Sequence, residues 1–435
     1  MTERRVSPAG PLKGRIRVPG DKSISHRALM LSALAIGQSR ISGLLEGEDV
    51  LATAAALRQM GARIERDGAA WIVDGVGVGT LLQPAAALDM GNSGTSARLL
   101  MGLLASHGIT AVMTGDGSLS RRPMQRVIEP LSRMGARIDP MPGGILPLRI
   151  EGMQPAIPIT YRLPVASAQV KSAILLAALN IPGTTTVIEP VPTRDHTERM
   201  LEAFGVRVDV TMQDGARTIA LTGPADLSPA AIEVPGDPSS AAFVAVAASI
   251  VPDSDLVIEN VGLNPTRDGL FRVLAEMGAN IESLNPRTVG GEPVTDLRVR
   301  YAPLRGIDVD PALAPSMIDE FPALFVAAAF AEGTTRTSGL EELRVKESDR
   351  LSAMARALGD MGASVEERED GLIIVGTGGH PLPGGAAIAT HLDHRIAMSG
   401  AIAGLASRKG ATLDDAGAVA TSFPGFFDLI DRTTR

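Results

Sequence analysis

The stretch PGDKSISHR, residues 19–27, runs directly into the apolar segment ALMLSAL, residues 28–34. A Pro-Gly pair stops a strand, the polar residues after it can cap a helix, and Lys22 and Arg27 fall in the first turns of that helix. Backbone N–H groups at a helix start carry partial positive charge, which two cations would reinforce. The stretch predicts either an anion site at a helix start or an ordinary capped helix with two solvated cations.

The same form recurs along the chain. A polar loop followed by a helix that is apolar on nearly all sides is predicted in six segments, namely 20–36, 91–105, 165–179, 236–250, 319–331 and 391–405. A second marker alternates with the first, an amphipathic helix that ends in glycine, at Gly61, Gly135, Gly205, Gly278 and Gly362. Each repeat therefore reads strand, buried helix, strand, amphipathic helix, strand, and six repeats divide naturally into two domains of three.

The sixth repeat ends near Phe427 without its strand, whereas a strand without a repeat is predicted at 13–18. We expect this N-terminal strand to complete the sixth repeat. The chain then crosses between domains at two VPGD segments, 18–21 and 234–237, so that residues 1–18 with 235–435 form one lobe and 19–234 form the other. Two Pro-Gly crossings would make a hinge, and we expect the lobes to close around a ligand in the cleft between them.

Composition excludes several classes of function. With 435 residues the chain is too long for one ordinary core, and its net charge of −8 and 3% aromatic content argue against a nucleic-acid partner. The absence of cysteine excludes disulfides, thiolate zinc sites and a cysteine nucleophile. The His391 and His394 pair is more typical of structural histidines than of ligands, so no metal and no cofactor are predicted. With no export signal and no membrane span in the sequence, we expect a cytoplasmic monomer without a membrane partner.

The polar loops carry cations that an acidic protein can direct at a small anionic ligand. If the buried helices of each lobe point the same way, these loops converge on the cleft. The set consists of Lys22, Arg27, Arg98, Arg121, Arg122, Lys171, Arg194, Arg267, Lys346, Arg350 and Arg395. For any single member, a solvated position or an internal ion pair remains the alternative.

Nine segments in order carry a resemblance to a known family. They are GDKSISHRA (20–28), GNSGTSARL (91–99), RRPM (121–124), SAQVKSA (167–173), TRDHTER (193–199), NPTRDG (264–269), DEFP (319–322), RVKESDRL (344–351) and DHRIAM (393–398). The whole chain resembles the 5-enolpyruvylshikimate-3-phosphate synthases, which transfer an enolpyruvyl group from phosphoenolpyruvate to shikimate 3-phosphate. The resemblance implies an α/β (α+β) fold of two lobes, each built from three βαβαββ units with buried parallel helices.

The resemblance also implies roles for individual residues. It assigns shikimate 3-phosphate to Lys22, Ser23, Arg27, Ser167, Ala168, Gln169, Arg194, Asp319 and Lys346. It assigns phosphoenolpyruvate to Lys22, Gly94, Arg122, Gln169, Arg350 and Arg395, where forked guanidinium donors suit a carboxylate and a phosphate.

The reaction needs a base for the 5-hydroxyl and an acid for the vinyl carbon, and two carboxylates near cations can divide this work. We expect Asp319 to be the base and Glu347 the proton donor, with Lys22 sharing the proton transfers. The alternative for Glu347 is an ordinary i,i+3 ion pair with Arg350.

Four departures place the chain in the more divergent branch of the family, which includes enzymes that tolerate the inhibitor glyphosate. Thr421 stands where a lysine is common, Ala168 and Arg194 stand where serines are common, and Glu342 replaces an asparagine. Tolerance is linked in the family to an extra methyl at the position of Gly94, so we expect that this glycine does not by itself exclude glyphosate.

Two other functions were weighed. The sister enzyme that transfers enolpyruvate to UDP-N-acetylglucosamine typically has Lys-Asn where this chain has Lys22-Ser23, and often uses a cysteine. A non-catalytic repeat scaffold would not need carboxylates and cations gathered at helix starts. The glycine runs at 75–79 and 376–379 do not open helices, so they indicate turns rather than nucleotide sites.

Overall fold

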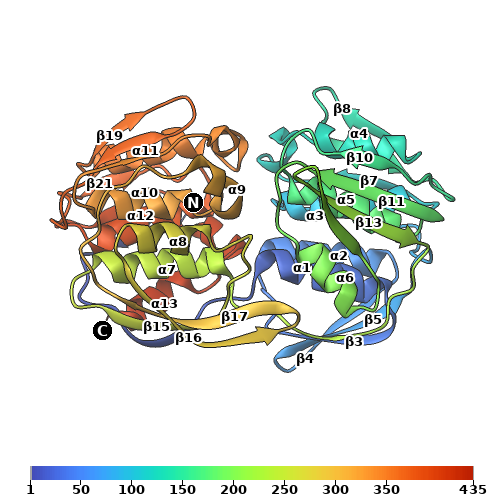
Figure 1. Cartoon of the computed structure of the whole chain (residues 1–435), viewed down its shortest axis with the longest axis horizontal. Coiled ribbons are helices and arrows are strands. Elements are labelled where there is room, and N and C mark those ends of the chain that lie inside the picture. Colours follow the sequence, from blue (N-terminus) through green and yellow to red (C-terminus); the bar gives the residue numbers. More distant parts are fainter. Residues whose placement is uncertain (1, 435) are drawn as a thin grey trace. The chain divides into compact units, whose positions relative to one another are not determined.

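The structure is a computed structural model that describes residues 2–434. The chain divides into two compact units. The first unit contains the described residues up to 19, with 235–288 and 292–434, and the second contains 20–234 with 289–291. Figure 1 shows the course of the chain, which leaves the first unit after Pro19 and returns to it after Val234.

Three buried helices form the centre of each unit. In the second unit they are α1 (Lys22–Leu34), α3 (Gly94–Ala105) and α5 (Ala168–Ala178), and in the first α7 (Pro238–Ile250), α10 (Phe321–Phe330) and α12 (His394–Leu405). Within the first unit α7, α10 and α12 pack on one another, and within the second α3 packs along α5. Every residue of α7 and α10 is buried, as expected for helices that lack a polar face. The six predicted helices are confirmed.

Amphipathic helices lie between the buried ones in the sequence. They are α2 (Glu48–Gln59), α4 (Gln125–Arg133), α6 (His196–Ala203), α8 (Gly269–Glu276), α11 (Arg350–Asp360) and α13 (Phe426–Thr433), with a short α9 (Ala314–Met317). The predicted glycine follows five of them, at φ angles between +84° and +106°. Only glycine adopts such angles at little cost, which explains the repeated residue.

Three sheets enclose the helices of the second unit in the described residues. The first sheet has the order β14 (Ala231–Glu233), β3 (Ile36–Ser42), β5 (Ala70–Val76), β4 (Arg63–Asp67). The second has the order β6 (Leu88–Asp89), β7 (Thr110–Thr114), β9 (Ile145–Glu151), β8 (Arg137–Met141). The third has the order β10 (Thr160–Arg162), β11 (Gly183–Glu189), β13 (Ala216–Gly223), β12 (Asp209–Gln213). In each sheet the first of these strands pairs in parallel with the second, and the remaining pairs are antiparallel.

The first unit repeats this plan with three sheets in the same described range. Their orders are β2 (Lys13–Arg17), β15 (Asp255–Gly262), β17 (Glu292–Arg300), β16 (Asn280–Val289); β18 (Thr334–Arg336), β20 (Leu372–Val375), β19 (Ser364–Glu367); and β1 (Arg4–Val6), β22 (Ala411–Leu413), β21 (Ala386–Ile388). Each unit therefore contains three copies of one helix-and-sheet repeat.

The expectation that the strand at 13–18 completes the sixth repeat was wrong. Strand β2 pairs in parallel with β15, with Lys13 opposite Asp255, so it belongs to the fourth repeat. The sixth repeat is completed instead by β1, which pairs antiparallel with β22. Strand β1 has only three residues, two of them arginines, and therefore gave no recognisable strand signal.

At each of the two VPGD segments the chain passes from a strand in one unit to a helix in the other. Strand β2 stays in the first unit although α1, which follows it, belongs to the second. Strand β14 pairs with β3 in the second unit although α7, which follows it, belongs to the first. Each crossing thus joins the edge strand of one unit to a buried helix of the other.

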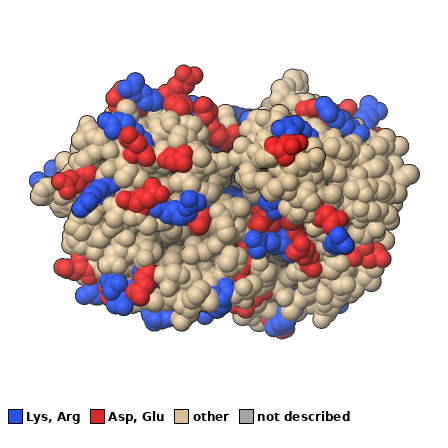
Figure 2. All heavy atoms as spheres, in the orientation of Figure 1, with Lys and Arg blue, Asp and Glu red and all other residues tan. Residues whose placement is uncertain are grey.

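The surface agrees with the composition. Figure 2 shows basic and acidic side chains interspersed over the face in view rather than gathered into one basic area. Within residues 2–434, none of the helices combines the length and the apolar character that crossing a membrane requires.

Replacing Gly278 tests the role of the helix-ending glycines. Its φ is +90° and the nearest atom to an added Cβ, the Pro303 carbonyl oxygen, is 3.6 Å away, so backbone strain alone opposes a side chain. Gly278→Ala is expected to lower the free energy of unfolding by about 1–2 kcal/mol. The control is Gly359→Ala in α11, where nothing lies within 4 Å of the added methyl. This change is expected to raise stability by up to about 1 kcal/mol. Equal effects in chemical denaturation would contradict the interpretation.

Candidate active site

The polar loops of the second unit cap its buried helices. Asp21 caps α1 by accepting a hydrogen bond from the Ile24 amide (2.9 Å), and Ser93 caps α3 by accepting one from Ser96 (3.0 Å). Ser167 caps α5 in the same way through the Val170 amide (3.3 Å), and Ala168 is the first residue of that helix. Each cap leaves the other N–H groups of its helix start available to an anion.

Lys22 and Ser23 open helix α1. The Lys22 ammonium forms an ion pair with the Asp49 carboxylate near the start of α2, and both side chains are largely buried. The pKa of His26, one turn further on, is held well below its ordinary value by burial and by the charges of Lys22 and Arg27. Burial is the larger cause of this lowered pKa, and the two cations at the start of α1 add to it.

Arg27 is only 3% exposed. It donates to the hydroxyl oxygens of Ser172 in α5 (2.6 Å) and Thr197 in α6 (2.7 Å), and to the Ser23 carbonyl (2.9 Å). The guanidinium thus joins α1 to two neighbouring helices and fixes the backbone beside Lys22.

Four further residues predicted from the sequence lie around the start of α3. Arg98 donates to the Gln169 side-chain oxygen (2.6 Å), and Gln169 donates to Thr95 (3.1 Å). Arg122 is 8% exposed and donates to the side-chain oxygen of Asn92 (2.7 Å). A Cβ on Gly94 would lie 3.1 Å from Arg98 and 3.4 Å from Arg122. The structure therefore brings Gly94, Arg122 and Gln169 together.

Two members of the predicted cation set are buried and paired with carboxylates. Lys171 is fully buried between Glu189 (3.1 Å) and Glu198 (2.9 Å), and Arg267 is 2% exposed beside Asp237 (3.4 Å). Both form internal ion pairs, which is the alternative that the sequence left open for single members of the set. Arg121 is exposed at the end of a 3-10 turn.

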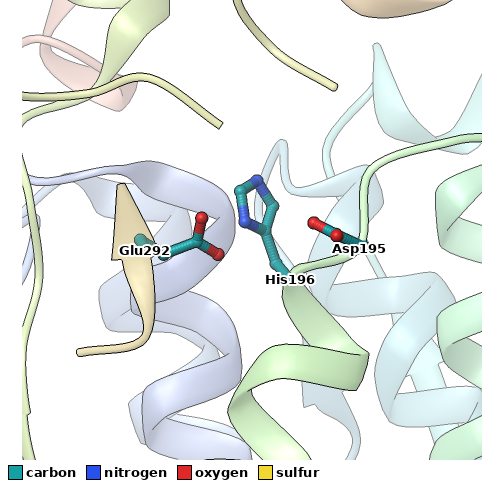
Figure 3. Close-up of side chains that lie close together, drawn as sticks. All are labelled: Asp195, His196 and Glu292. Carbon is teal, nitrogen blue, oxygen red and sulfur yellow. The ribbon is translucent and has the colours of Figure 1, made fainter. Parts of the chain in front are cut away.

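Arg194 lies half-buried in the loop before α6. Figure 3 shows the next two residues, Asp195 and His196. Asp195 in this loop pairs with Arg199 (3.0 Å), and His196 begins the helix. Glu292, also drawn in Figure 3, is the first residue of β17 in the first unit, where it accepts a hydrogen bond from Asn264 (2.8 Å). Asp195 thus forms an ion pair, and Glu292 a hydrogen bond, within its own unit.

The guanidinium of Arg350 is the centre of the site in the first unit. Its side chain is 1% exposed and lies against three carboxylates, those of Glu347 (2.5 Å), Asp393 (2.9 Å) and Asp319 (3.4 Å). The ammonium of Lys346 lies 3.7 Å from Asp319, and Arg395 donates to the Asp319 carbonyl (2.7 Å). The structure thus gathers all the site residues that the sequence predicted for this unit.

Charge explains why these groups stay ionised. Burial alone would lower the pKa of the Arg350 guanidinium, but the surrounding carboxylates raise it above its ordinary value. Burial alone would raise the pKa of the Asp393 carboxyl, but the charge of Arg350 brings it below its ordinary value. The i,i+3 ion pair between Glu347 and Arg350 is present, and the same guanidinium also contacts Asp319.

Sequence reasoning assigned no role to Asp393 or Asp49. Asp393 caps α12 through the Arg395 amide (2.9 Å) while binding Arg350, and its place before a buried helix was the available signal. Asp49 follows Glu48 at the start of α2, where an acidic residue also suits the helix dipole. Thr421, where a lysine is common in related enzymes, donates its hydroxyl to the Ala418 carbonyl (2.8 Å).

The fold belongs to a known class. The enolpyruvyl transferase NikO from Streptomyces tendae superposes with a TM-score of 0.74, covering 99% of this chain and 96% of its own, at 19% identity. At that identity the likeness shows the fold alone, an enolpyruvyl transferase fold as the sequence predicted.

The family follows from closer relatives. A family model described as EPSP synthase (3-phosphoshikimate 1-carboxyvinyltransferase) matches residues 6–430. The chain is 67% identical to 3-phosphoshikimate 1-carboxyvinyltransferase from Novosphingobium aromaticivorans, with 100% of both chains covered. EPSP synthase from Acinetobacter baumannii has a TM-score of 0.88 at 48% identity, covering 99% of this chain and 98% of that one. The chain therefore belongs to the EPSP synthase family.

Neutralising Asp393 tests the Arg350 cluster. Asp393→Asn keeps a residue that can cap α12 but removes a buried counter-charge, and is expected to cost roughly 3 kcal/mol of unfolding free energy at pH 7. Because the pKa of Asp393 is lower in the folded protein, its contribution is present above about pH 4 and is lost as the pH falls through the lowered value. The difference between wild type and variant should therefore shrink in acid. Asp349→Asn, at the more exposed cap of α11, is the control, and an equal loss there would contradict this account.

Proposed function

We propose that this enzyme transfers the enolpyruvyl group of phosphoenolpyruvate to the 5-hydroxyl of shikimate 3-phosphate and releases inorganic phosphate. The observation that carries the proposal is the pairing of Asp319 and Glu347 on one buried guanidinium, that of Arg350. Family membership supplies the reaction class, and this pairing supplies two carboxylates whose surroundings differ. Asp319 lies 3.7 Å from the ammonium of Lys346, and Glu347 lies 2.5 Å from the guanidinium of Arg350.

The proposed ligand contacts come from both units. Shikimate 3-phosphate is assigned to Lys22, Ser23, Arg27, Ser167, Ala168, Gln169, Arg194, Asp319 and Lys346. Phosphoenolpyruvate is assigned to Lys22, Gly94, Arg122, Gln169, Arg350 and Arg395. Support comes from the grouping of Gly94, Arg122 and Gln169 around α3. It also comes from Arg350 and Arg395, which donate to the carboxylate and to the carbonyl oxygen of Asp319.

The chemistry proceeds by addition and elimination. The 5-hydroxyl oxygen attacks C2 of phosphoenolpyruvate as Asp319 takes its proton, while the methylene carbon gains a proton from Glu347 and becomes a methyl group. In the elimination a methyl proton returns to the Glu347 carboxylate, which restores the double bond, and the departing phosphate takes up the proton that Asp319 accepted. Cations around the carboxylate and phosphate stabilise the charge that develops, and Lys22 shares in the proton transfers.

A transfer to UDP-N-acetylglucosamine is the alternative within the same fold. The relatives found are 3-phosphoshikimate 1-carboxyvinyltransferases, and Ser23 follows Lys22 where the sister enzyme typically has asparagine. These observations favour shikimate 3-phosphate as the acceptor. We further propose that the enzyme acts in the cytoplasm on these small molecules.

We also propose that the chain belongs to the more divergent branch that includes glyphosate-tolerant enzymes. Support comes from Thr421, Ala168, Arg194 and Glu342. Thr421 cannot supply the ammonium that a lysine would offer at this position, and its hydroxyl donates to the Ala418 carbonyl.

Phosphate release with both substrates tests the activity. Wild type is expected to release phosphate only when phosphoenolpyruvate and shikimate 3-phosphate are both present. Asp319→Asn should lower kcat by roughly 10²–10⁴-fold, the usual contribution of a general base. Asp310→Asn, an exposed carboxylate that caps a nearby turn, is the matched control and should retain wild-type kcat. Release with UDP-N-acetylglucosamine instead of shikimate 3-phosphate would contradict the proposal.

Gly94→Ala tests the proposed phosphoenolpyruvate site. The new methyl would lie against the guanidinium groups of Arg98 and Arg122, and glyphosate is the longer of the two ligands. The inhibition constant of glyphosate is therefore expected to rise more than the KM of phosphoenolpyruvate in steady-state assays. Equal losses for the two ligands would contradict this assignment.

A further inference from the structure

A second buried ion pair lies beside the proposed base but outside the assigned contacts. Glu320 is 1% exposed and Arg267 is 2% exposed, and their charged groups are 3.7 Å apart. The hydroxyl of Ser239, at the start of α7, donates to Glu320 and accepts a hydrogen bond from Arg267 (2.7 Å). Arg267 also lies 3.4 Å from Asp237, which caps α7. The pair therefore joins the start of α7 to the start of α10.

Glu320 is directly connected to the site. It follows Asp319 in the chain, and its carboxylate is 3.9 Å from the guanidinium of Arg395. The same nitrogen of Arg395 donates to the Asp319 carbonyl oxygen at 2.7 Å. Glu320 and the Asp319 carbonyl thus both lie near the same nitrogen of one guanidinium.

The carboxylates of Asp319 and Glu320, which are neighbours in the chain, form ion pairs with different arginines. Asp319 points to Arg350, whereas Glu320 points to Arg267. Because both residues precede the rigid, fully buried helix α10, fixing the Glu320 side chain also fixes the backbone from which Asp319 projects. A buried carboxylate is expensive unless it is paired, and in the described residues only one oxygen of Glu320 accepts a hydrogen bond. The positive charges of Arg267 and Arg395 therefore stabilise the buried carboxylate of Glu320.

We propose that Arg267 and Glu320 form a positioning pair that orients Asp319 and Arg395 for the reaction. This role rests on the proposed function, since it assumes that Asp319 acts as the base. The competing explanation is an ion pair that only stabilises the unit. The two differ in what they predict for kcat once stability has been restored.

Three variants separate these explanations. Glu320→Gln keeps the shape and an acceptor for Ser239, Arg267→Met removes the cation, and the third variant combines both. Each single change removes one partner of a buried charge and should lower Tm. The double variant should recover part of Tm because both members of the pair are then neutral, while Asp237 and Arg395 still lose a charged neighbour. Asp296→Asn in β17, a carboxylate that pairs with Arg287 (3.1 Å) in the same unit, is the matched control.

Phosphate release at saturating substrates gives the decisive readout. Glu320→Gln is expected to lower kcat by about 10- to 100-fold, the cost of a small misplacement of a catalytic group. The loss should fall mainly on kcat, with a smaller rise in the KM of phosphoenolpyruvate because Glu320 also lies beside Arg395. The double variant should keep the low kcat although its Tm recovers, and Asp296→Asn should keep the wild-type kcat.

A double-mutant cycle shows whether Glu320 acts through Asp319. If it does, adding Glu320→Gln to Asp319→Asn lowers kcat no further. Recovery of kcat together with Tm in the double variant, or full additivity in the cycle, would overturn the positioning role while leaving the proposed function intact. A wild-type protein that released no phosphate would overturn the proposed function, and this role with it.

Discussion

The burial of one guanidinium, that of Arg350, is the constraint on which the site of the first unit depends. Three carboxylates from separate segments, at 319, 347 and 393, lie within 3.4 Å of it. Carboxylates gathered so closely would repel one another or take up protons without a permanent positive charge among them. Because arginine stays protonated in any such setting, the cluster remains charged and fixed. The two proposed catalytic groups thus owe their mutual placement to one residue.

The repeat explains how distant residues reach this cluster. Asp319 lies just before α10, Arg350 begins α11, and Asp393 caps α12, so each comes from the start of a different helix. The second unit uses the same device, with Lys22 at the start of α1 and Gln169 at the start of α5. Apolar helices with no solvent-facing side can carry charged groups only at their ends, and the loops there become the functional part of each repeat.

Much of this organisation was visible in the sequence, because it follows from local chemistry. Buried helices and their glycine-terminated partners have periodic signatures that hold wherever they occur, and most of the predicted site residues lie at their starts. The partners of individual charges were not predictable. Lys171 and Arg267 look like anion ligands in the sequence but face carboxylates 18 and 30 residues away, at Glu189 and Asp237. Ion pairs between residues so far apart in the sequence depend on how the chain packs. The pairing of the short strand β1 with β22 depends on packing in the same way.

The cluster around Arg350 is proposed to serve proton transfer in an addition and elimination. Carrying out the reaction in D2O and measuring the mass of the enolpyruvyl product tests this most directly. Protonation of the methylene carbon passes through a methyl group, so the account predicts deuterium in the vinyl group of the product. A product formed at the normal rate without deuterium would contradict it, because the methylene carbon would then never have received a proton.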